Sequence, residues 1–292
     1  MDNKKPAQSS QNVFRILKWF WEFSGLRFVY RKIRPHTHQE ENASGFRKPS
    51  TFFLWFIGLW VASYGIASQK YENRLDRAES KLALLASQLY GGQRTQALER
   101  LGTVQNTPCP RNPTLLNLKS ITHAIFSENS KCRSVVEGAQ DILVANKDHL
   151  NDLTLNNLNL SGTQLNLANF TKSELFNTDL SSAKLYQAQF VGSIFVNVDF
   201  TDANLRNSNF KGAKGTLLDF TNANLVEADF TNFTVGYRMN GNLDEDELIK
   251  LLEKASSLYM AKGIPENVIA QLKKRKAELF EHPHAVNRLI GH

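Results

Sequence analysis

The chain has 292 residues, enough for one or two domains with linkers, and its 41% hydrophobic content excludes a chain that is disordered throughout. Its net charge of +7 is concentrated at one end, because residues 1–50 hold ten basic and four acidic residues. The remaining residues are close to neutral, which argues against a basic surface over the whole protein. A basic N-terminal block indicates a local partner, either anionic lipid or nucleic acid.

Residues 1–48 are predicted to form a basic cytoplasmic segment. Within it, residues 13–34 read VFRILKWFWEFSGLRFVYRKIR, in which apolar and aromatic residues alternate with six basic ones. This pattern favours an amphipathic helix on the inner leaflet of a membrane over an ordinary packed helix, because Trp19 and Trp21 suit the headgroup zone.

A charge-free run follows at residues 49–69, in which Thr51–Ser68 reads TFFLWFIGLWVASYGIAS. A bilayer core needs about 20 mostly apolar helical residues, so we predict one transmembrane helix here, with a buried core helix as the alternative. The run exceeds the roughly 7–15 apolar residues of a signal peptide. The excess of Lys and Arg before the run places the N-terminus in the cytoplasm. The prediction is a single-pass inner (cell) membrane protein whose later residues are periplasmic or otherwise extracytoplasmic.

Residues 70–100 are predicted to form a helical stalk or a short coiled coil, because apolar residues recur at heptad spacing and the helix ends at Gly91-Gly92. Two interpretations stay open: a homo-oligomer through the 71–89 heptads, or one helix that packs on its own globular part. The seam residues are Tyr71, Leu75, Ala78, Leu82, Leu85 and Leu89.

Residues 101–149 are predicted to form a helical N-terminal cap, with short helices near 115–126 and 134–149. This segment holds both cysteines, Cys109 and Cys132. Outside the cytoplasm they can pair, and in the chain-entropy model closing such a loop stabilises the fold by about 3 kcal/mol. Two free cysteines are the alternative, because spacing alone does not establish a bridge.

From residue 150 a period of five residues dominates the sequence. Small residues recur two positions before each large apolar residue, and Asn or Asp recurs one position before it. In the whole series only the slot at Gly215 lacks its apolar side chain. The large residues are Leu150, Leu155, Leu160, Leu165, Phe170, Leu175, Leu180, Leu185, Phe190, Phe195, Phe200, Leu205, Phe210, Phe220, Leu225 and Phe230.

A period of five fits neither an α-helix nor a strand, so the backbone must turn regularly. A square coil, with one five-residue unit on each side, places the large and the small residue of every unit inside. The sequences ANF at 168–170, ANL at 203–205 and 223–225, and ADF at 228–230 resemble the A(D/N)LXX motif of the pentapeptide-repeat family. That resemblance implies a right-handed quadrilateral β-helix over residues 150–235. The predicted fold class is therefore mainly β solenoid, flanked by α-helices, with one N-terminal transmembrane helix.

Because one unit forms each side of a square coil, the large residues sort into four ladders along the solenoid. Large residues at the small positions, which are Leu153, Leu158, Val198 and Leu218, depart from the motif. They leave open whether Leu155 belongs to the first coil or to the cap, and we expect Leu217 and Leu218 to fill the space at Gly215. The ladders on which the prediction depends most are Phe170, Phe190, Phe210 and Phe230, and Leu165, Leu185, Leu205 and Leu225.

Residues 236–292 are predicted to form a helical C-terminal cap and tail. A helix is expected from the acidic residues at 244–246 to Gly263, and another from Pro265 to Phe280. The string SLYMAKGIPENVIAQLKKRKAELFE is similar to tails that follow the repeats in membrane-linked members of the family. Such a cap would cover the strand edges that an open solenoid exposes.

The sequence contains no GxSxG, HExxH, P-loop or GxGxxG motif, and its histidines are scattered, with HPH at 282–284 interpreted as a polar tail. We therefore predict no enzyme activity, no cofactor and no metal. The predicted function is a non-catalytic, membrane-tethered binding or scaffolding protein with an unknown protein partner. Lipid is its partner at Thr51–Ser68 and at the basic segment, and no nucleic acid is expected. The family resemblance implies one alternative, a cytoplasmic DNA mimic that acts on a type II topoisomerase.

Overall fold

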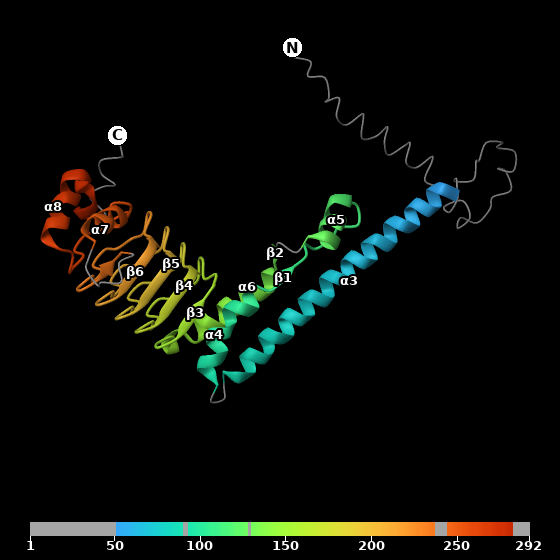
Figure 1. The fold of residues 1–292 in the computed structure, drawn as a ribbon, viewed down its shortest axis with the longest axis horizontal. Helices are drawn as coiled ribbons and strands as arrows, with labels where there is room; N and C mark the ends of the chain where they lie inside the picture. Colours follow the sequence, from blue (N-terminus) through green and yellow to red (C-terminus); the bar gives the residue numbers. More distant parts are fainter. Residues whose placement is uncertain (1–50, 90–92, 128–129, 237–243, 283–292) are drawn as a thin grey trace, which may run out of the picture. The chain divides into compact units, whose positions relative to one another are not determined.

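The computed structural model describes residues 51–89, 93–127, 130–236 and 244–282, with side chains from Leu54 onward (Figure 1). The basic segment, with its predicted amphipathic helix at 13–34, lies outside the described residues. The described residues form two units. One combines residues up to 69 with 112–125, and the other combines 70–111 with the residues from 126 onward.

The first unit contains the N-terminal part of α3 (Thr51–Gln88) and most of α5 (Leu118–Phe126). Ala67 of α3 is fully buried against Ile121 and Ala124 of α5. The indole Nε1 of Trp60 donates a hydrogen bond to the carbonyl oxygen of Leu115, at 2.7 Å. The segment around α5 therefore packs on α3, whereas the sequence predicted that it would join the cap on the solenoid.

Among the residues whose side chains the structure describes, no helix contains a stretch both long and apolar enough to cross a membrane. The span predicted at 49–69 begins before those residues. The transmembrane part of the predicted fold is therefore not confirmed.

The second unit is a β-solenoid of about four turns with helices at both ends, as predicted (Figure 1). Its helices and short strands before the solenoid are α4 (Arg94–Gln105), β1 (Pro108–Cys109), β2 (Ser130–Lys131), α6 (Arg133–Ala145) and the 3-10 helix η1 (Lys147–His149). The strands of the solenoid are β3 (Thr154–Asn156), β4 (Glu174–Asp179), β5 (Ile194–Asp199), β6 (Lys214–Asp219) and β7 (Thr234–Val235). The closing elements are α7 (Glu245–Leu252), α8 (Glu266–Arg275) and the 3-10 helix η2 (Ala277–Phe280).

Successive coils pair in parallel at a constant offset, so that equivalent repeats lie opposite each other. In the five-stranded sheet β3-β4-β5-β6-β7, Leu155 lies opposite Leu175, Leu175 opposite Phe195, and Gly215 opposite both Phe195 and Val235. Isolated bridges on the other sides keep the same offset, as between Asn169 and Gln189. Leu155 therefore belongs to the first coil, which resolves the uncertainty about the first turn.

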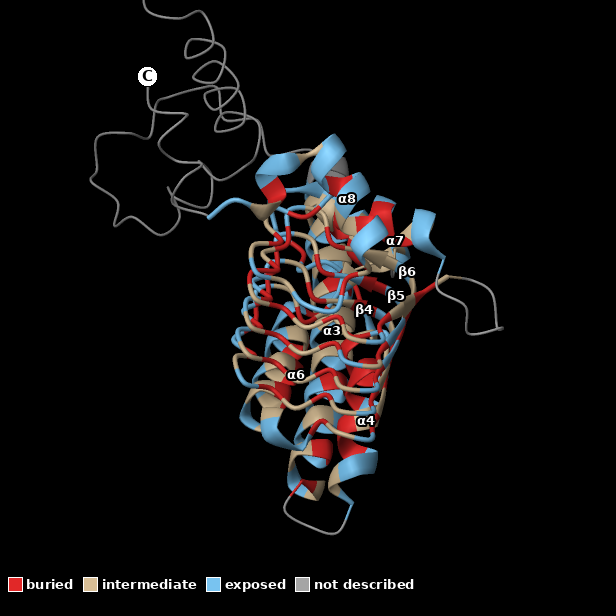
Figure 2. Ribbon diagram, turned by 90° about the vertical axis from the view of Figure 1, so that its left-hand side faces the viewer, coloured by how far each residue is buried: buried red, intermediate tan, exposed pale blue. Residues whose placement is uncertain are grey.

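The large residues of the repeats are buried, and Figure 2 shows buried positions recurring along the coils. The two ladders singled out from the sequence are at most 2% exposed. Phe170, Phe190, Phe210 and Phe230 form one stack, with ring centroids 4.9–5.2 Å apart and nearly parallel planes. The interior is therefore a continuous apolar column that each coil extends by one layer.

The large residues that depart from the motif belong mostly to one ladder of the sheet side. Leu158 and Val198 are buried in this ladder together with Thr178, while Leu218 is half-buried. A Cβ on Gly215 would overlap the Leu218 side chain and approach the ring of Phe233. Leu218 and Phe233 therefore fill the space at Gly215, whereas Leu217 points outward and is 61% exposed.

Where Asn or Asp precedes a large residue, it has a structural role at the corner. Its side-chain oxygen accepts a hydrogen bond from the backbone N–H two residues later. Asp179 accepts from Ser181 at 3.0 Å, and Asn209 accepts from Lys211 at 3.1 Å. The corner residue that follows each inward position of the series by two residues has positive φ throughout the coils, between 49° and 68°. These Asx turns explain why the motif requires Asn or Asp at this position.

At Asp229 the hydroxyl of Thr231 donates to the carboxylate at 2.6 Å. This bond, with the backbone N–H of Thr231 and the charges of Lys211 and Lys262, outweighs partial burial and holds the pKa of Asp229 below its ordinary value. The acid in the last full coil is therefore stabilised in its charged form.

The first coil is capped by side chains that take the place of a preceding coil. Gln105 of α4 is fully buried. Its amide oxygen accepts from the backbone N–H of Asn159 at 2.6 Å, and its amide nitrogen donates to the carbonyl oxygen of Asn159 at 2.8 Å. Glu99 accepts from the N–H of Thr154 at 3.1 Å. A Cβ on Gly102 would overlap the carbonyl of Asn156, so α4 can lie this close only with glycine there.

The heptad seam is occupied by the chain itself. Ala78, Leu85 and Leu89 are buried in the same core as the solenoid, with Leu75 and Leu82 packed against them. A Cβ on Gly138 of α6 would approach the Leu82 methyl group to 2.7 Å, and Glu79 accepts a hydrogen bond from Ser134. Of the two interpretations, intramolecular packing is the one that the structure shows, and the coiled coil is not supported.

The C-terminal cap contains a partial coil that was not predicted from the sequence. The single helix predicted to reach Gly263 is wrong, because α7 ends at Leu252 and the chain then lies along the last full coil. Asn224 pairs with Ser257, and Asp229 pairs with Lys262. The carbonyl oxygens of Ser257 and Lys262 accept from Leu225 and Phe230. A Cβ on Gly263, where φ is 74°, would overlap the backbone of Thr231. The helix predicted from Pro265 appears as α8 followed by η2.

Substitution of Gln105 by Ala tests the cap. It leaves the N–H of Asn159 without its partner, while Gln140 still donates to the carbonyl oxygen of Asn159 at 3.1 Å. An unsatisfied buried group costs about 1–3 kcal/mol, so we expect a loss of that size in the free energy of unfolding, measured by urea denaturation. Thr103→Ala, on the exposed side of the same helix, is the matched control with a change within about 0.5 kcal/mol. Equal effects of the two variants would contradict the capping role.

Substitution of Asp229 by Asn tests the charged corner. Asn keeps the acceptor, as at Asn169 and Asn209 in the same ladder. The lowered pKa means that the extra stability from the charge is fully present above the unfolded value of about 3.9 and is lost as pH falls through the folded pKa. The stability advantage of the wild type over Asp229→Asn should therefore shrink between pH 6 and acid pH in urea titrations. An advantage that stays constant with pH would show that the charge contributes nothing.

Candidate binding surface on the solenoid

The outward side of the sheet carries apolar side chains on a coil whose surface is otherwise mainly polar. Phe176 of β4 pairs with Val196 of β5, and both are half-buried. Ile194 lies two residues before Val196, on the same side of β5, and is 37% exposed. We call Phe176, Ile194 and Val196, together with Leu217, the sheet patch.

Leu217 occupies a corner position at which the preceding coils have asparagine. Asn157, Asn177 and Asn197 precede it in the ladder, and the amide of each later Asn donates to the preceding one at 3.2 and 2.9 Å. The backbone of Leu217 has φ of 54°, a conformation that Asn tolerates and Leu rarely adopts. Leu167 has the same conformation at another corner and is 55% exposed, so the conformation alone does not mark a site. Leu217 is singled out because the preceding coils of its ladder have Asn and because a cavity opens beside it.

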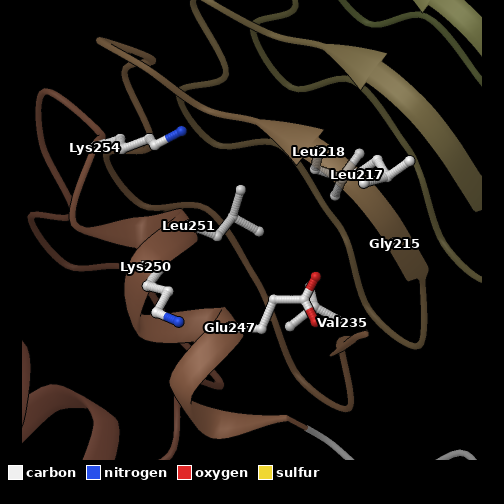
Figure 3. A pocket seen from close by; sticks show the side chains of 8 residues that line it. All are labelled: Gly215, Leu217, Leu218, Val235, Glu247, Lys250, Leu251 and Lys254. Atoms are coloured by element: carbon white, nitrogen blue, oxygen red, sulfur yellow. The ribbon is translucent and has the colours of Figure 1, made fainter. Parts of the chain in front are cut away.

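A small cavity opens beside Leu217, where the last strands meet α7 (Figure 3). We call it the rim pocket, and its volume is about 190 Å³. Leu217 and Leu218 lie on the solenoid side, with Leu251 of α7 facing them (Figure 3). The lining residues are Gly215, Leu217, Leu218, Val235, Glu247, Lys250, Leu251 and Lys254. This volume is below the roughly 300–1,000 Å³ of small-molecule sites, so it suits one side chain of a partner better than a cofactor.

The charges of the rim pocket are of both signs. Lys254 lies with its Nζ 3.7 Å from the carboxylate of Asp219. Burial opposes the ionisation of Asp219, but hydrogen bonds from Thr221 and the charge of Lys254 outweigh it and hold the pKa of Asp219 below its ordinary value. Asp219 therefore stays ionised at neutral pH. At the corner it accepts a hydrogen bond from the backbone N–H of Thr221 at 2.9 Å. This arrangement provides no general acid or base.

The residues singled out from the sequence separate into structural groups. The ladder phenylalanines and leucines lie inside the coils, out of reach of any partner. Cys109 and Cys132 form a disulfide beside the β1–β2 pair, with Cα atoms 5.2 Å apart. Within the described ranges, no group of three or more His, Cys, Asp or Glu side chains is placed to hold a metal ion. His282, the described residue of the HPH tail, stacks edge-on against Tyr259.

The sheet patch was not predicted from the sequence, although one signal was present. The corner positions 157, 177 and 197 are Asn, and 217 is Leu. Sorting the outward positions into ladders, like the inward ones, reveals this change from Asn to Leu. The positive φ at this corner, which makes the leucine unusual, requires the structure.

Comparison with known proteins agrees with this geometry. The family model described as pentapeptide repeats matches residues 173–212 and 193–232, with eight copies of the repeat. A comparison with curated proteins found no match.

Several solved structures are similar over part of the chain. A pentapeptide repeat protein from the thylakoid lumen of Arabidopsis thaliana is 25% identical, with 35% of this chain and 70% of that chain covered and a TM-score of 0.24. The protein Rfr23 from the cyanobacterium Cyanothece 51142 is 27% identical, with 29% and 58% covered and a TM-score of 0.18. This chain thus spans less than two thirds of Rfr23. QnrB1, a plasmid-mediated fluoroquinolone resistance protein, is 14% identical, with 46% and 71% covered and a TM-score of 0.21.

The constant offset between coils, the Asx corners and the family match lead to the same conclusion. The solenoid of this chain is built from pentapeptide repeats.

Proposed function

We propose that this protein is a non-catalytic binding or scaffolding protein whose solenoid presents the sheet patch and the rim pocket to a protein partner. The observation that carries the proposal is the exposed Leu217, in a backbone conformation that Leu rarely adopts and where the preceding coils have Asn. Phe176 of β4 and Ile194 and Val196 of β5, in the same sheet, are also apolar and face outward. A partially exposed apolar cluster on a polar surface marks a site of protein interaction.

The rigidity of the solenoid supports this proposal. The patch residues lie on β4, β5 and β6. Parallel pairing along these strands holds their backbones in place. A partner that binds a preformed surface loses little free energy in ordering the receptor. An apolar side chain of the partner could enter the rim pocket between Leu217 and Leu251, with the mixed charges of α7 at the edge.

The charge of the solenoid argues against the alternative of a DNA mimic. Residues 150–236 carry eight acidic and five basic residues. Basic side chains such as Lys172 and Lys211 lie among the acids, so the surface lacks the dense negative charge of a duplex. Inhibition or protection of a type II topoisomerase by the purified protein in a supercoiling assay would favour this alternative.

We further propose that the chain is tethered to the inner membrane near residues 49–69, with the solenoid on the extracytoplasmic side. The described part of this segment supports a lipid contact, because Leu54, Trp55, Leu59 and Ile66 expose half or more of their surface. The basic residues of 1–50 suit the anionic headgroups of the inner leaflet.

The binding surface is tested by Ile194→Glu in the full chain. A partner that covers the patch would have to desolvate the added charge, so partner binding should fall at least about tenfold, which corresponds to about 1.4 kcal/mol. Quantitative cross-linking and affinity purification from native membranes provide the measurement. Gln164→Glu makes the same change of charge at an exposed position on another side of the coil. Unchanged recovery of every partner with Ile194→Glu would refute the sheet patch as the binding surface.

The tether is tested with reporter fusions after residue 69. A phosphatase reporter that is active only outside the cytoplasm should be active, and a fluorescent reporter that folds only in the cytoplasm should be dark. The matched fusion after residue 48 should give the opposite pattern. Cytoplasmic signals from both fusions would rule out the proposed topology.

A further inference from the structure

The outward side of the sheet arranges its side chains in two rows across β3, β4, β5 and β6, which lie side by side (Figure 1). Neighbours within a row lie about 4.8 Å apart along the solenoid, and the two rows lie about 6.6 Å apart along the strands. The first row is Thr154, Glu174, Ile194, Lys214 and Thr234, and the second row is Asn156, Phe176, Val196 and Thr216.

The first row has opposite charges at equal distances from Ile194. Glu174 lies one coil before Ile194 and Lys214 lies one coil after it, with a threonine beyond each of them. The two charged side chains stand two coils apart, about 9.6 Å. Of the ion pairs formed by the described residues, none involves Glu174 or Lys214. This row therefore has the charge pattern that complements a reversed copy of itself.

The second row fits the same reversal by size. Val196 lies beside Ile194 on β5, with Phe176 one coil before it and Thr216 one coil after it. A reversed copy places the large phenyl ring of Phe176 over the smaller Thr216, next to Leu217 at the following corner. Side-chain layers of two facing sheets interdigitate in this way, with large groups over small ones.

We propose that the partner of the sheet patch is a second copy of this chain. The two copies are related by a twofold axis parallel to β5 and centred on Ile194 and Val196, so that their solenoids are antiparallel. In this pair Ile194 and Val196 each face their own counterpart, and Glu174 of each copy faces Lys214 of the other. Such a contact is isologous, as a twofold axis requires. This inference rests on the proposed function, to which it adds the identity of the partner.

Parallel solenoids do not give this fit. A twofold axis along the solenoid would exchange the two rows, so that Glu174 would face the phenyl ring of Phe176 and Lys214 would face Thr216. Both charges would then be covered without a partner of opposite sign, which is costly. The charge pattern therefore selects the antiparallel pair.

The small size of this side makes the pair weak. The row from Thr154 to Thr234 is about 19 Å long, so each copy buries on the order of 300 Å², below the roughly 800 Å² per partner of stable complexes. Ile194 is 37% exposed, which leaves apolar area at the centre for the contact to cover. Copies that associate and dissociate in this way are best captured by a covalent cross-link.

Cysteine cross-linking of the full chain in detergent micelles tests the proposal. The two native cysteines are bonded to each other, so only an introduced cysteine reacts with a bismaleimide. Facing sheets lie about 10 Å apart, and a reagent of about that span joins Ile194→Cys of two copies. The yield of covalent dimer should be several-fold higher than for Gln164→Cys, an exposed position on another side of the coil.

Charge reversal tests the arrangement within the Ile194→Cys chain. Glu174→Lys places lysine opposite lysine, and Lys214→Glu places glutamate opposite glutamate, so each change should lower the yield several-fold. The two changes together restore opposite charges across the twofold axis and should restore the yield. This rescue, with circular dichroism on each variant, separates a lost contact from a misfolded chain.

The outcomes distinguish this inference from the proposed function. Equal yields at residues 194 and 164 overturn the self-pair, and the proposed function then stands only if Ile194→Glu lowers the recovery of a different protein. A high yield at residue 194 that the charge reversals leave unchanged refutes the antiparallel pair. If neither cross-linking nor partner recovery depends on residue 194, both proposals fail.

Discussion

The hydrogen bonds between successive coils constrain the rest of this structure. Each coil donates to and accepts from its neighbours at a constant offset, and this offset stacks every inward position on the equivalent position of the next coil. A slip of one residue would move Asn209 to the inward position of Phe210. The apolar column and the backbone ladder therefore enforce the same register, and neither could be maintained without the other.

Such a ladder leaves unpaired backbone groups at both ends, and the chain satisfies them in two different ways. At the first coil, side chains do so, with Gln105 bonded to both backbone groups of Asn159. At the last coil, the chain adds part of another coil through Ser257 and Lys262. Both solutions require a glycine at the point of closest approach, Gly102 or Gly263, because the capping backbone lies directly on the coil. An edge closed in this way is protected against pairing with another chain.

The sequence predicted the solenoid well because its period is repeated many times and depends only on local spacing. The partial coil escaped prediction because an insertion that includes α7 makes the offset from Asn224 to Ser257 longer than the offset between the other coils. In addition, Leu252, Ala255 and Tyr259 are spaced as in a helix. The heptad seam was ambiguous for a related reason. A stripe of apolar residues has the same spacing whether it faces a second chain or its own domain. The structure distinguishes the two, because Ala78, Leu85 and Leu89 are buried in the core of the solenoid unit.

The proposed binding surface follows from the same repetition. Because the inward positions are fixed by packing and the corners by Asx turns, only the outward positions of the sides are free to vary. On the sheet side, Phe176, Val196 and Ile194 occupy such outward positions. At residue 217 a Leu stands where the preceding coils have Asn, although the backbone there favours Asn. The change at Leu217 weakens the local turn preference and adds exposed apolar area beside the rim pocket. Both effects are unfavourable for an isolated solenoid. A partner that covers the patch leaves the cost of the turn unchanged, but it makes the apolar area favourable by removing it from water.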